Sequence, residues 1–128
     1  MKYLLDTHIL LWAATNSPKL SQVARDIIND DTNDLYFSAA SIWEIAIKTS
    51  LGKPEFNVNS ALLRRLLLDN GYHELIINSH HATATETLLD IHKDPFDRML
   101  IAQSQTEGIT LLSADEKVIA YGHTVMRV

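Results

Sequence analysis

The stretch "DPFDRMLIAQSQTEGITLLSAD", from Asp94 to Asp115, predicts a helix that leads into a buried strand. Pro95 is favoured at the first position of a helix, and an aspartate directly before it is a good N-cap. Gly108 marks the C-terminal end of this helix. The apolar run 109–113 then fits a short strand. An apolar strand that is fed by a helix is typical of a parallel sheet with helices on both faces.

The same alternation of strands and helices extends over the rest of the chain. Further strands are expected at Lys2–Leu5, Asp34–Ser38, Glu74–Ile77 and Thr124–Val128, and further helices at His8–Ala14, Ser21–Asn29, Ala39–Gly52, Ser60–Gly71, Ser79–His92 and shortly after Ser113. The pattern predicts an α/β fold. The length of 128 residues suits a single domain, 1–128, with a core of useful size.

Composition limits the classes of function. The chain has no cysteine, which excludes disulfides and cysteine-ligated zinc and suits a reducing cytoplasm. Its net charge is −5, whereas a protein that holds nucleic acid by bulk electrostatics is usually basic, so a nucleic-acid partner would need cations at a local site. Asp6 and His8 interrupt the apolar start, which argues against a signal peptide. No apolar run approaches the ~20 residues that span a bilayer, so we expect no membrane partner.

Four acidic residues are expected to meet at one edge of the sheet. Asp6 directly follows the first strand and Asp115 lies two residues beyond the fourth, at the carboxyl ends where sites form in such sheets. Asp97 lies in the first turn of the helix before the fourth strand, and Glu44 lies in the helix after the second. Crowded carboxylates repel one another unless a cation is bound, and Mg²⁺ and Mn²⁺ prefer oxygen ligands.

Each of these acids also has a purely structural explanation. Asp6 suits an N-cap, and Glu44 suits an i,i+4 ion pair with Lys48. Asp97 suits the dipole of its helix. Asp115 suits the second position of a capping box that begins at a serine. The four acids together are less easily explained in this way than each one alone.

The motifs that carry the four acids resemble those of PIN-domain ribonucleases, and more closely those of VapC-type toxins from prokaryotic type II toxin–antitoxin pairs. They are "YLLDTHILLW" around Asp6, "SAASIWEIAIK" around Glu44, "DPFDRMLIAQS" around Asp97 and "LLSADEKV" around Asp115. The resemblance covers essentially the whole chain. It implies a three-layer α/β/α PIN-like fold with a central parallel five-stranded sheet of order 3-2-1-4-5. It also implies a homodimeric ribonuclease that hydrolyses RNA phosphodiester bonds with Mg²⁺, or Mn²⁺ in its place, and is inhibited by a cognate antitoxin protein.

On this resemblance, Asp6, Glu44 and Asp97 form the core of a catalytic metal site, and Asp115 is a second-shell or second-metal ligand. Supporting roles are expected for Thr7 and Ser38 in orienting carboxylates or water, for Asp94 as a cap, for Arg98 as a phosphate contact or an exposed helix residue, and for Ser113, a hydroxyl where threonine is frequent. His80 and His81 are expected to be structural.

Other functions fit the same composition. A receiver-like signalling domain needs an aspartate after its middle strand, where "ELIINSHH" has none. An aspartyl phosphatase needs an acid at position 8, where this chain has His8. A catalytically inactive PIN-fold interaction module stays as an alternative, although the presence of all four acids argues against it. The RNA target does not follow from the sequence.

One predicted helix has more leucine than a single buried stripe needs. The segment 61–71 contains Leu62, Leu63, Leu66, Leu67 and Leu68. Some of these side chains are therefore expected either to stay exposed as a contact surface or to dock on the sheet.

Overall fold

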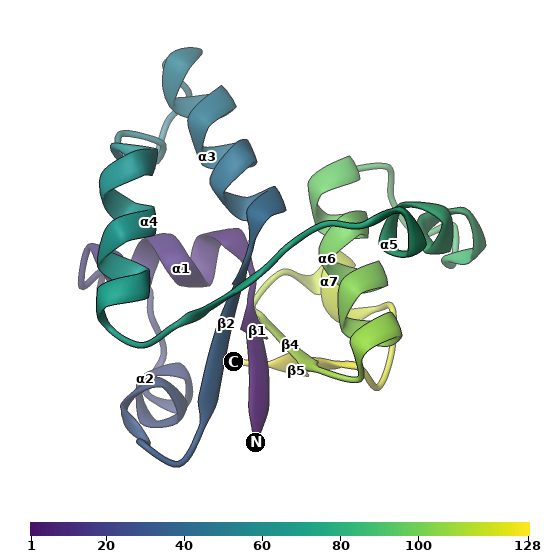
Figure 1. The fold of residues 1–128 in the computed structure, drawn as a ribbon, viewed down its shortest axis with the longest axis horizontal. Helices are drawn as coiled ribbons and strands as arrows, with labels where there is room; N and C mark the ends of the chain where they lie inside the picture. The colour runs from purple at the N-terminus through teal and green to yellow at the C-terminus, as the bar shows by residue number, and fades with distance from the viewer.

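The structure, a computed structural model, describes all 128 residues and has three layers, with helices on both faces of one sheet (Figure 1). The strands are β1 (Lys2–Leu5), β2 (Asp34–Ser38), β3 (His73–Leu75), β4 (Thr110–Ser113) and β5 (Val125–Arg127). Every neighbouring pair is parallel, and the order is β3-β2-β1-β4-β5. The predicted fold class and strand order are therefore confirmed.

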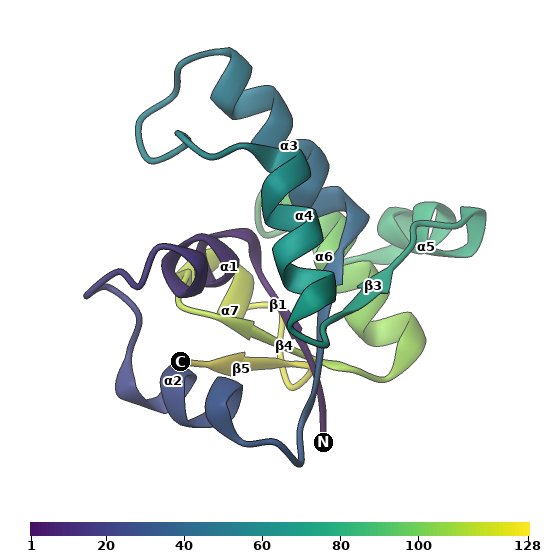
Figure 2. The ribbon, with the colours of Figure 1, turned by 60° about the vertical axis from the view of Figure 1, so that its left-hand side comes forward.

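The helices pack against two separate apolar clusters. They are α1 (Thr7–Ala14), α2 (Gln22–Asn29), α3 (Ala39–Ser50), α4 (Ser60–Asp69), α5 (Ser79–Ala84), the 3₁₀ helix η1 (Thr85–Thr87), α6 (Pro95–Glu107) and α7 (Glu116–Ile119). Leu5 and Leu112 face a cluster built with α1, α2 and α4, whereas Leu4 and Leu111 face one built with α6 and α7. Figure 2 shows α3 beside α4 and α5 beside α6. No helix has both the length and the apolar character that crossing a membrane requires.

The helix α6 has the predicted boundaries. Asp94 caps it by accepting a hydrogen bond from the backbone N–H of Asp97 at 2.9 Å, and Pro95 takes the first helical position. Gly108 ends it with a left-handed φ of 66°, a conformation that costs glycine little. Because α6 runs back to the start of β4, its first turn lies at the carboxyl-end edge of the sheet.

The predicted helix 79–92 is wrong beyond Ala84. The chain continues as the short 3₁₀ helix η1 and then as a loop, 88–94. The hydroxyls of Thr85 and Thr87 each donate to the carbonyl three residues earlier, which competes with helical hydrogen bonding. Arg98 then donates to the carbonyls of Thr85, Leu89 and His92. These bonds fix the loop against the first turn of α6.

The third strand is also shorter than predicted. Residues 74–77 were expected to form it, but pairing covers His73–Leu75. The carbonyl of Ile76 instead accepts a hydrogen bond from Gln103 of α6 at 3.3 Å. Ile76 and Ile77 thus leave the edge of the sheet and turn toward α6.

Candidate active site

Asp6 lies at the carboxyl end of the central strand β1 and is only 5% exposed. Its Oδ1 accepts a hydrogen bond from the N–H of Ile9 at 3.0 Å, so it caps α1. Its Oδ2 accepts one from Ser113 Oγ at 2.5 Å, across the β1–β4 pair. Burial raises the pKa of Asp6 above its ordinary value and the charge of Asp115 raises it further, while the two hydrogen bonds oppose this change. Asp6 is thus held in a fixed orientation at the centre of the edge.

Asp97 lies in the first turn of α6 and is partly buried. Burial raises its pKa to about 6, and the negative charges of Asp94, Asp6 and Glu44 add to the rise. A hydrogen bond from His92, whose Nε2 lies 3.0 Å from Asp97 Oδ2, acts in the opposite direction. Three like charges therefore act on one carboxylate.

Glu44 is the most buried of the four acids, with 3% of its surface exposed. Lys48 Nζ donates to its Oε2 at 2.5 Å, as the i,i+4 spacing predicted. Its Oε1 is buried and has no hydrogen-bond partner. An unpartnered buried carboxylate oxygen is costly, so this atom is free to accept a cation.

Asp115 is exposed and caps α7, with its Oδ1 accepting from the N–H of Lys117 at 2.9 Å. The predicted capping box, with Asp115 at the second position, is wrong. Ser113 Oγ, the expected cap, instead donates to Asp6 and accepts from the N–H of Asp115 at 3.1 Å. Asp115 and Asp6 line one cavity of about 200 Å³, whose other walls are His8, Trp12, Glu55 and Ala114.

The structure thus places Asp97 within electrostatic reach of both Asp6 and Glu44, and places Asp115 within electrostatic reach of Asp6. No three acidic or histidine side chains are arranged to hold a metal ion between them. Mg²⁺ usually keeps several waters and binds through one or two carboxylates. The all-oxygen donors and the unpartnered Oε1 of Glu44 fit such an ion.

Two of the expected supporting hydroxyls do not contact the acids. Thr7 Oγ1 donates to Ser41 Oγ at 3.0 Å, and Ser38 Oγ donates to Gln103 Oε1 at 2.6 Å. Both bonds are buried and tie α3 to its neighbours. The Arg98 guanidinium donates hydrogen bonds to carbonyls of the preceding loop and to a tyrosine hydroxyl. Arg98 therefore stabilises the conformation of this loop.

Neither His80 nor His81 forms a hydrogen bond with any of the four acids. His81 is buried, caps α5 together with Asn78, and lies 2.9 Å from Glu107. Its predicted structural role is confirmed. His80 is exposed.

Sequence reasoning missed two residues beside the acids. His92 contacts Asp97, but it lies in a segment whose pattern predicted a helix, which would have turned the side chain elsewhere. Glu55 lines the cavity of Asp6 from a loop after α3 and pairs with Lys19 at 2.5 Å and His8 at 3.5 Å. Its φ of 70° is unusual for a residue other than glycine. Neither position has a local sequence signal.

Comparison with known proteins agrees with this fold. The family model for the PIN domain matches residues 3–123. The VapBC2 complex of Rickettsia felis, bound to a DNA fragment from its promoter, aligns over 100% of this chain and 98% of its own with 14% identity and a TM-score of 0.70. VapBC-1 of nontypeable Haemophilus influenzae aligns over 100% and 97% with 18% identity and a TM-score of 0.67.

The name of a third solved structure states what that protein cleaves. VapC20 of Mycobacterium tuberculosis, described as a toxin that cleaves the sarcin–ricin loop, aligns over 94% of this chain and 95% of its own with 13% identity and a TM-score of 0.65. No curated protein matches the sequence.

Proposed function

The chain belongs to the PIN-domain family, and from this membership we propose that it is a Mg²⁺- or Mn²⁺-dependent ribonuclease that serves as the toxin of a type II toxin–antitoxin pair. The observation that carries the proposal is that the charges of Asp6 and Glu44 both act on the partly buried Asp97 and help to raise its pKa to about 6. Carboxylates with shifted pKa values cluster at functional sites because burial and like charges are arranged there to suit the chemistry.

The residues that would offer oxygens to the cation, directly or through bound water, are Asp6, Glu44 and Asp97, with Asp115 in the same cavity as Asp6. When bound, the ion would activate water and neutralise charge on a phosphodiester. The chain's own residues orient the donors: Ser113 fixes Asp6, His92 fixes Asp97 and Lys48 fixes one oxygen of Glu44. This agrees with the rule that carboxylate ligands are themselves held by hydrogen bonds.

The proposed partner is a small antitoxin protein. Solved structures with this fold include the toxin–antitoxin complexes VapBC2 and VapBC-1, and a toxin that is described as cleaving the sarcin–ricin loop. Their identities to this chain are below 20%, so the likeness supports the shared fold, and the extension to partner and substrate is our proposal. A receiver-like domain is disfavoured, since its order 2-1-3-4-5 places the third strand inside the sheet and here β3 is at the edge.

The test is cleavage of RNA by purified protein that has been freed of any antitoxin. We expect cleavage with Mg²⁺ or Mn²⁺, none with EDTA, and none with Asp97→Asn while its circular dichroism stays unchanged. Asp94→Asn is the matched control, because asparagine caps a helix as well as aspartate does. Undiminished cleavage by Asp97→Asn would exclude the assignment of Asp97. A well-folded wild type that cleaves no RNA with either metal would favour the inactive interaction module.

A further inference from the structure

Gln103 of α6 is fully buried, at 0% exposure, although glutamine is mostly an exposed residue. Its side-chain amide forms a hydrogen bond at each end. Oε1 accepts from Ser38 Oγ at 2.6 Å, and Nε2 donates to the carbonyl of Ile76 at 3.3 Å. Because a carbonyl can only accept, the amide nitrogen must face Ile76 and the amide oxygen must face Ser38. The orientation of the amide is thus fixed by its partners.

The two bonds join α6 to two other elements at the same edge of the sheet. Ser38 ends β2 and is the N-cap of α3, where its Oγ also accepts from the N–H of Ala40 at 3.0 Å. Ile76 directly follows β3. One amide therefore connects the start of α3, the end of β3 and α6. A buried polar network whose members are all satisfied specifies one arrangement of the elements that it joins.

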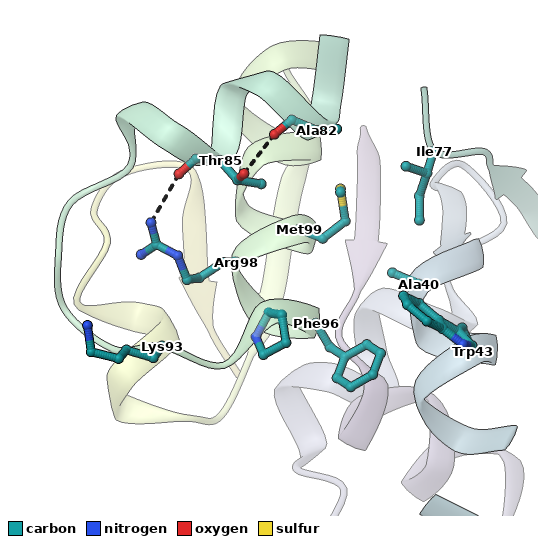
Figure 3. Close-up of a pocket in the computed structure, with 10 residues that line it drawn as sticks. Ala40, Trp43, Ile77, Ala82, Thr85, Lys93, Phe96, Arg98 and Met99 are labelled. Carbon is teal, nitrogen blue, oxygen red and sulfur yellow. Dashed lines mark hydrogen bonds between the residues drawn. The ribbon is translucent and has the colours of Figure 1, made fainter. Parts of the chain in front are cut away.

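Apolar packing leaves space between α3 and α6. A cavity of about 360 Å³ lies between these helices and the α5–η1 segment (Figure 3). Ala40 and Trp43 line it from α3, and Phe96 and Met99 line it from α6. The rings of Trp43 and Phe96 meet edge to face, with centroids 5.4 Å apart. Because the helices are not close-packed on this side, a directional bond such as that of Gln103 is needed to fix their spacing.

The spacing of these helices decides where two of the proposed metal ligands lie. Glu44 is on α3 and Asp97 is in the first turn of α6, and the charge of Glu44 acts on Asp97. We propose that Gln103 is a positioning residue whose two hydrogen bonds set the separation of Glu44 and Asp97. The inference rests on the proposed function, since it concerns the acids of that site. Gln103 is not itself a ligand, because both ends of its amide already have partners.

The spacing of the helices can be measured without metal or RNA. The chain has no cysteine, so Ala46→Cys on α3 and Gln105→Cys on α6, both at exposed positions, would carry the only two spin labels. Double electron–electron resonance in EDTA then gives the distance between the labels. Gln103→Met, which keeps the length of the side chain and loses both bonds, should broaden the distribution of distances and shift its mean. Ser104→Ala is the matched control and should change neither, because Ser104 is equally buried but donates within α6, to Ile101 at 2.9 Å.

Metal affinity tests whether this spacing matters to the acids. Gln103→Met should bind Mn²⁺ about 10- to 100-fold more weakly in calorimetric titration, as for other groups that orient metal ligands. Ser38→Ala should also weaken binding. The two changes together should weaken it by less than the product of their separate effects, because they break one shared bond. Ala24→Gly, at a buried position on α2, lowers stability through the helix backbone and should bind Mn²⁺ as the wild type does.

The outcomes separate this inference from the ribonuclease proposal. Unchanged distances in Gln103→Met, or changed distances with the affinity of the wild type for Mn²⁺, would overturn the positioning role whether or not the protein cleaves RNA. An equal loss of affinity in Ala24→Gly would assign the effect to stability and overturn it as well. Changed distances and weaker Mn²⁺ binding, in a protein whose wild type cleaves no RNA, would keep the positioning role and overturn the ribonuclease. If Gln103→Met does not fold, the same distances and affinities are required of Ser38→Ala, which breaks the same bond.

Discussion

His92 Nε2 lies 3.0 Å from Asp97 Oδ2, and the other nitrogen of the same ring, Nδ1, lies 2.7 Å from the hydroxyl of Tyr121. Arg98 donates to that hydroxyl at 2.9 Å. Because a guanidinium can only donate, the tyrosine oxygen accepts from it and can give its own proton to Nδ1. The imidazole then carries its proton on Nε2 and donates it to Asp97. One chain of bonds thus fixes both the tautomer of His92 and the orientation of the carboxylate.

The first prediction concerns this bond. Substituting His92 with Leu should weaken Mn²⁺ binding about 10- to 100-fold, as for other partners that orient metal ligands, and should raise the pKa of Asp97 because the hydrogen bond now lowers it. His92→Gln, which keeps a donor near the position of Nε2, should restore most of the affinity. Calorimetric titration with Mn²⁺ measures the first effect and carboxyl NMR the second. Equal affinities in all three proteins would contradict the positioning role.

The second prediction is a pH dependence of stability without metal. The pKa of Asp97 is about 6 in the folded chain, against an ordinary value of 3.8. Between these values the folded state binds more protons than the unfolded state, so the free energy of unfolding should fall as pH rises from about 4 to about 6. Asp97→Asn should lose this part of the pH dependence. At pH 8 it should melt a few degrees above the wild type, because ~1 kcal/mol shifts a domain of this size by roughly 2–8 °C.

Melting curves in EDTA across this pH range measure the difference between the two proteins. The loss of a helix-dipole contact in Asp97→Asn, ~0.3–1 kcal/mol, acts in the opposite direction at high pH. If the mutant melts lower than the wild type at every pH, Asp97 is mainly a helix-dipole residue and the like-charge repulsion is small.

The third prediction concerns metal binding. Mg²⁺ should stabilise the wild type through its preference for the folded state, by ~2.7 kcal/mol when its concentration is 100-fold above Kd. Asp6→Asn and Asp97→Asn should gain less from Mg²⁺. Asp94→Asn should gain as much as the wild type, because Asp94 is a cap and no proposed ligand. Calorimetry measures the increase in stability that Mg²⁺ produces. An equal increase in the wild type and the three variants would argue that these acids hold no metal.

The fourth prediction concerns the ion pair that holds Glu44. Lys48→Met leaves the buried carboxylate without its only partner, and breaking such a pair typically costs ~3–5 kcal/mol. Mg²⁺ should recover more stability in this mutant than in the wild type, because the ion replaces the missing positive charge. Lys19→Met is the matched control: it breaks an exposed pair with Glu55, and exposed pairs contribute little to stability. A small loss in Lys48→Met that Mg²⁺ does not change would contradict the prediction.

The fifth prediction concerns self-association. On α4, Leu63 and Leu67 are buried, while Leu62 and Leu66 are 53% and 48% exposed, so the leucines cover more than one stripe as predicted. We expect a homodimer that uses this exposed face. Leu62→Glu combined with Leu66→Glu should give the monomer mass of 14.4 kDa in light scattering. Leu89→Glu, at another exposed leucine, should stay dimeric. A wild type that is monomeric at micromolar concentration would exclude the dimer.

Local signals in the sequence were sufficient for most of the fold. Asp94, Pro95 and Gly108 gave both ends of α6, because caps act on the backbone within a few residues. The apolar runs predicted the strands, and the resemblance to PIN-domain ribonucleases predicted their order in the sheet. The expectation that Asp6, Asp97 and Asp115 lie at one edge followed from their positions at strand and helix ends, since topology alone brings those ends together.

Features that depend on contacts between distant segments did not follow from the sequence. The end of α5 depends on Arg98, which bonds to carbonyls from Thr85 to His92. The role of Asp115 depends on Ser113, whose hydroxyl is taken by Asp6. In each case a tertiary hydrogen bond overrides a local preference. The pattern of apolar and polar residues along the chain does not indicate such a bond.

The hydrogen bond between Ser113 and Asp6 joins residues that are 107 positions apart, and it has a consequence for synthesis. β1 is made first, but one of its two neighbours in the sheet is β4. At ~5–20 residues per second of translation, roughly 5–20 s pass between the two. During that time the amino-terminal part of a nascent chain holds Asp6 without the serine that orients it. The proposed nuclease can therefore orient Asp6 only after Ser113 has been translated, 107 residues later.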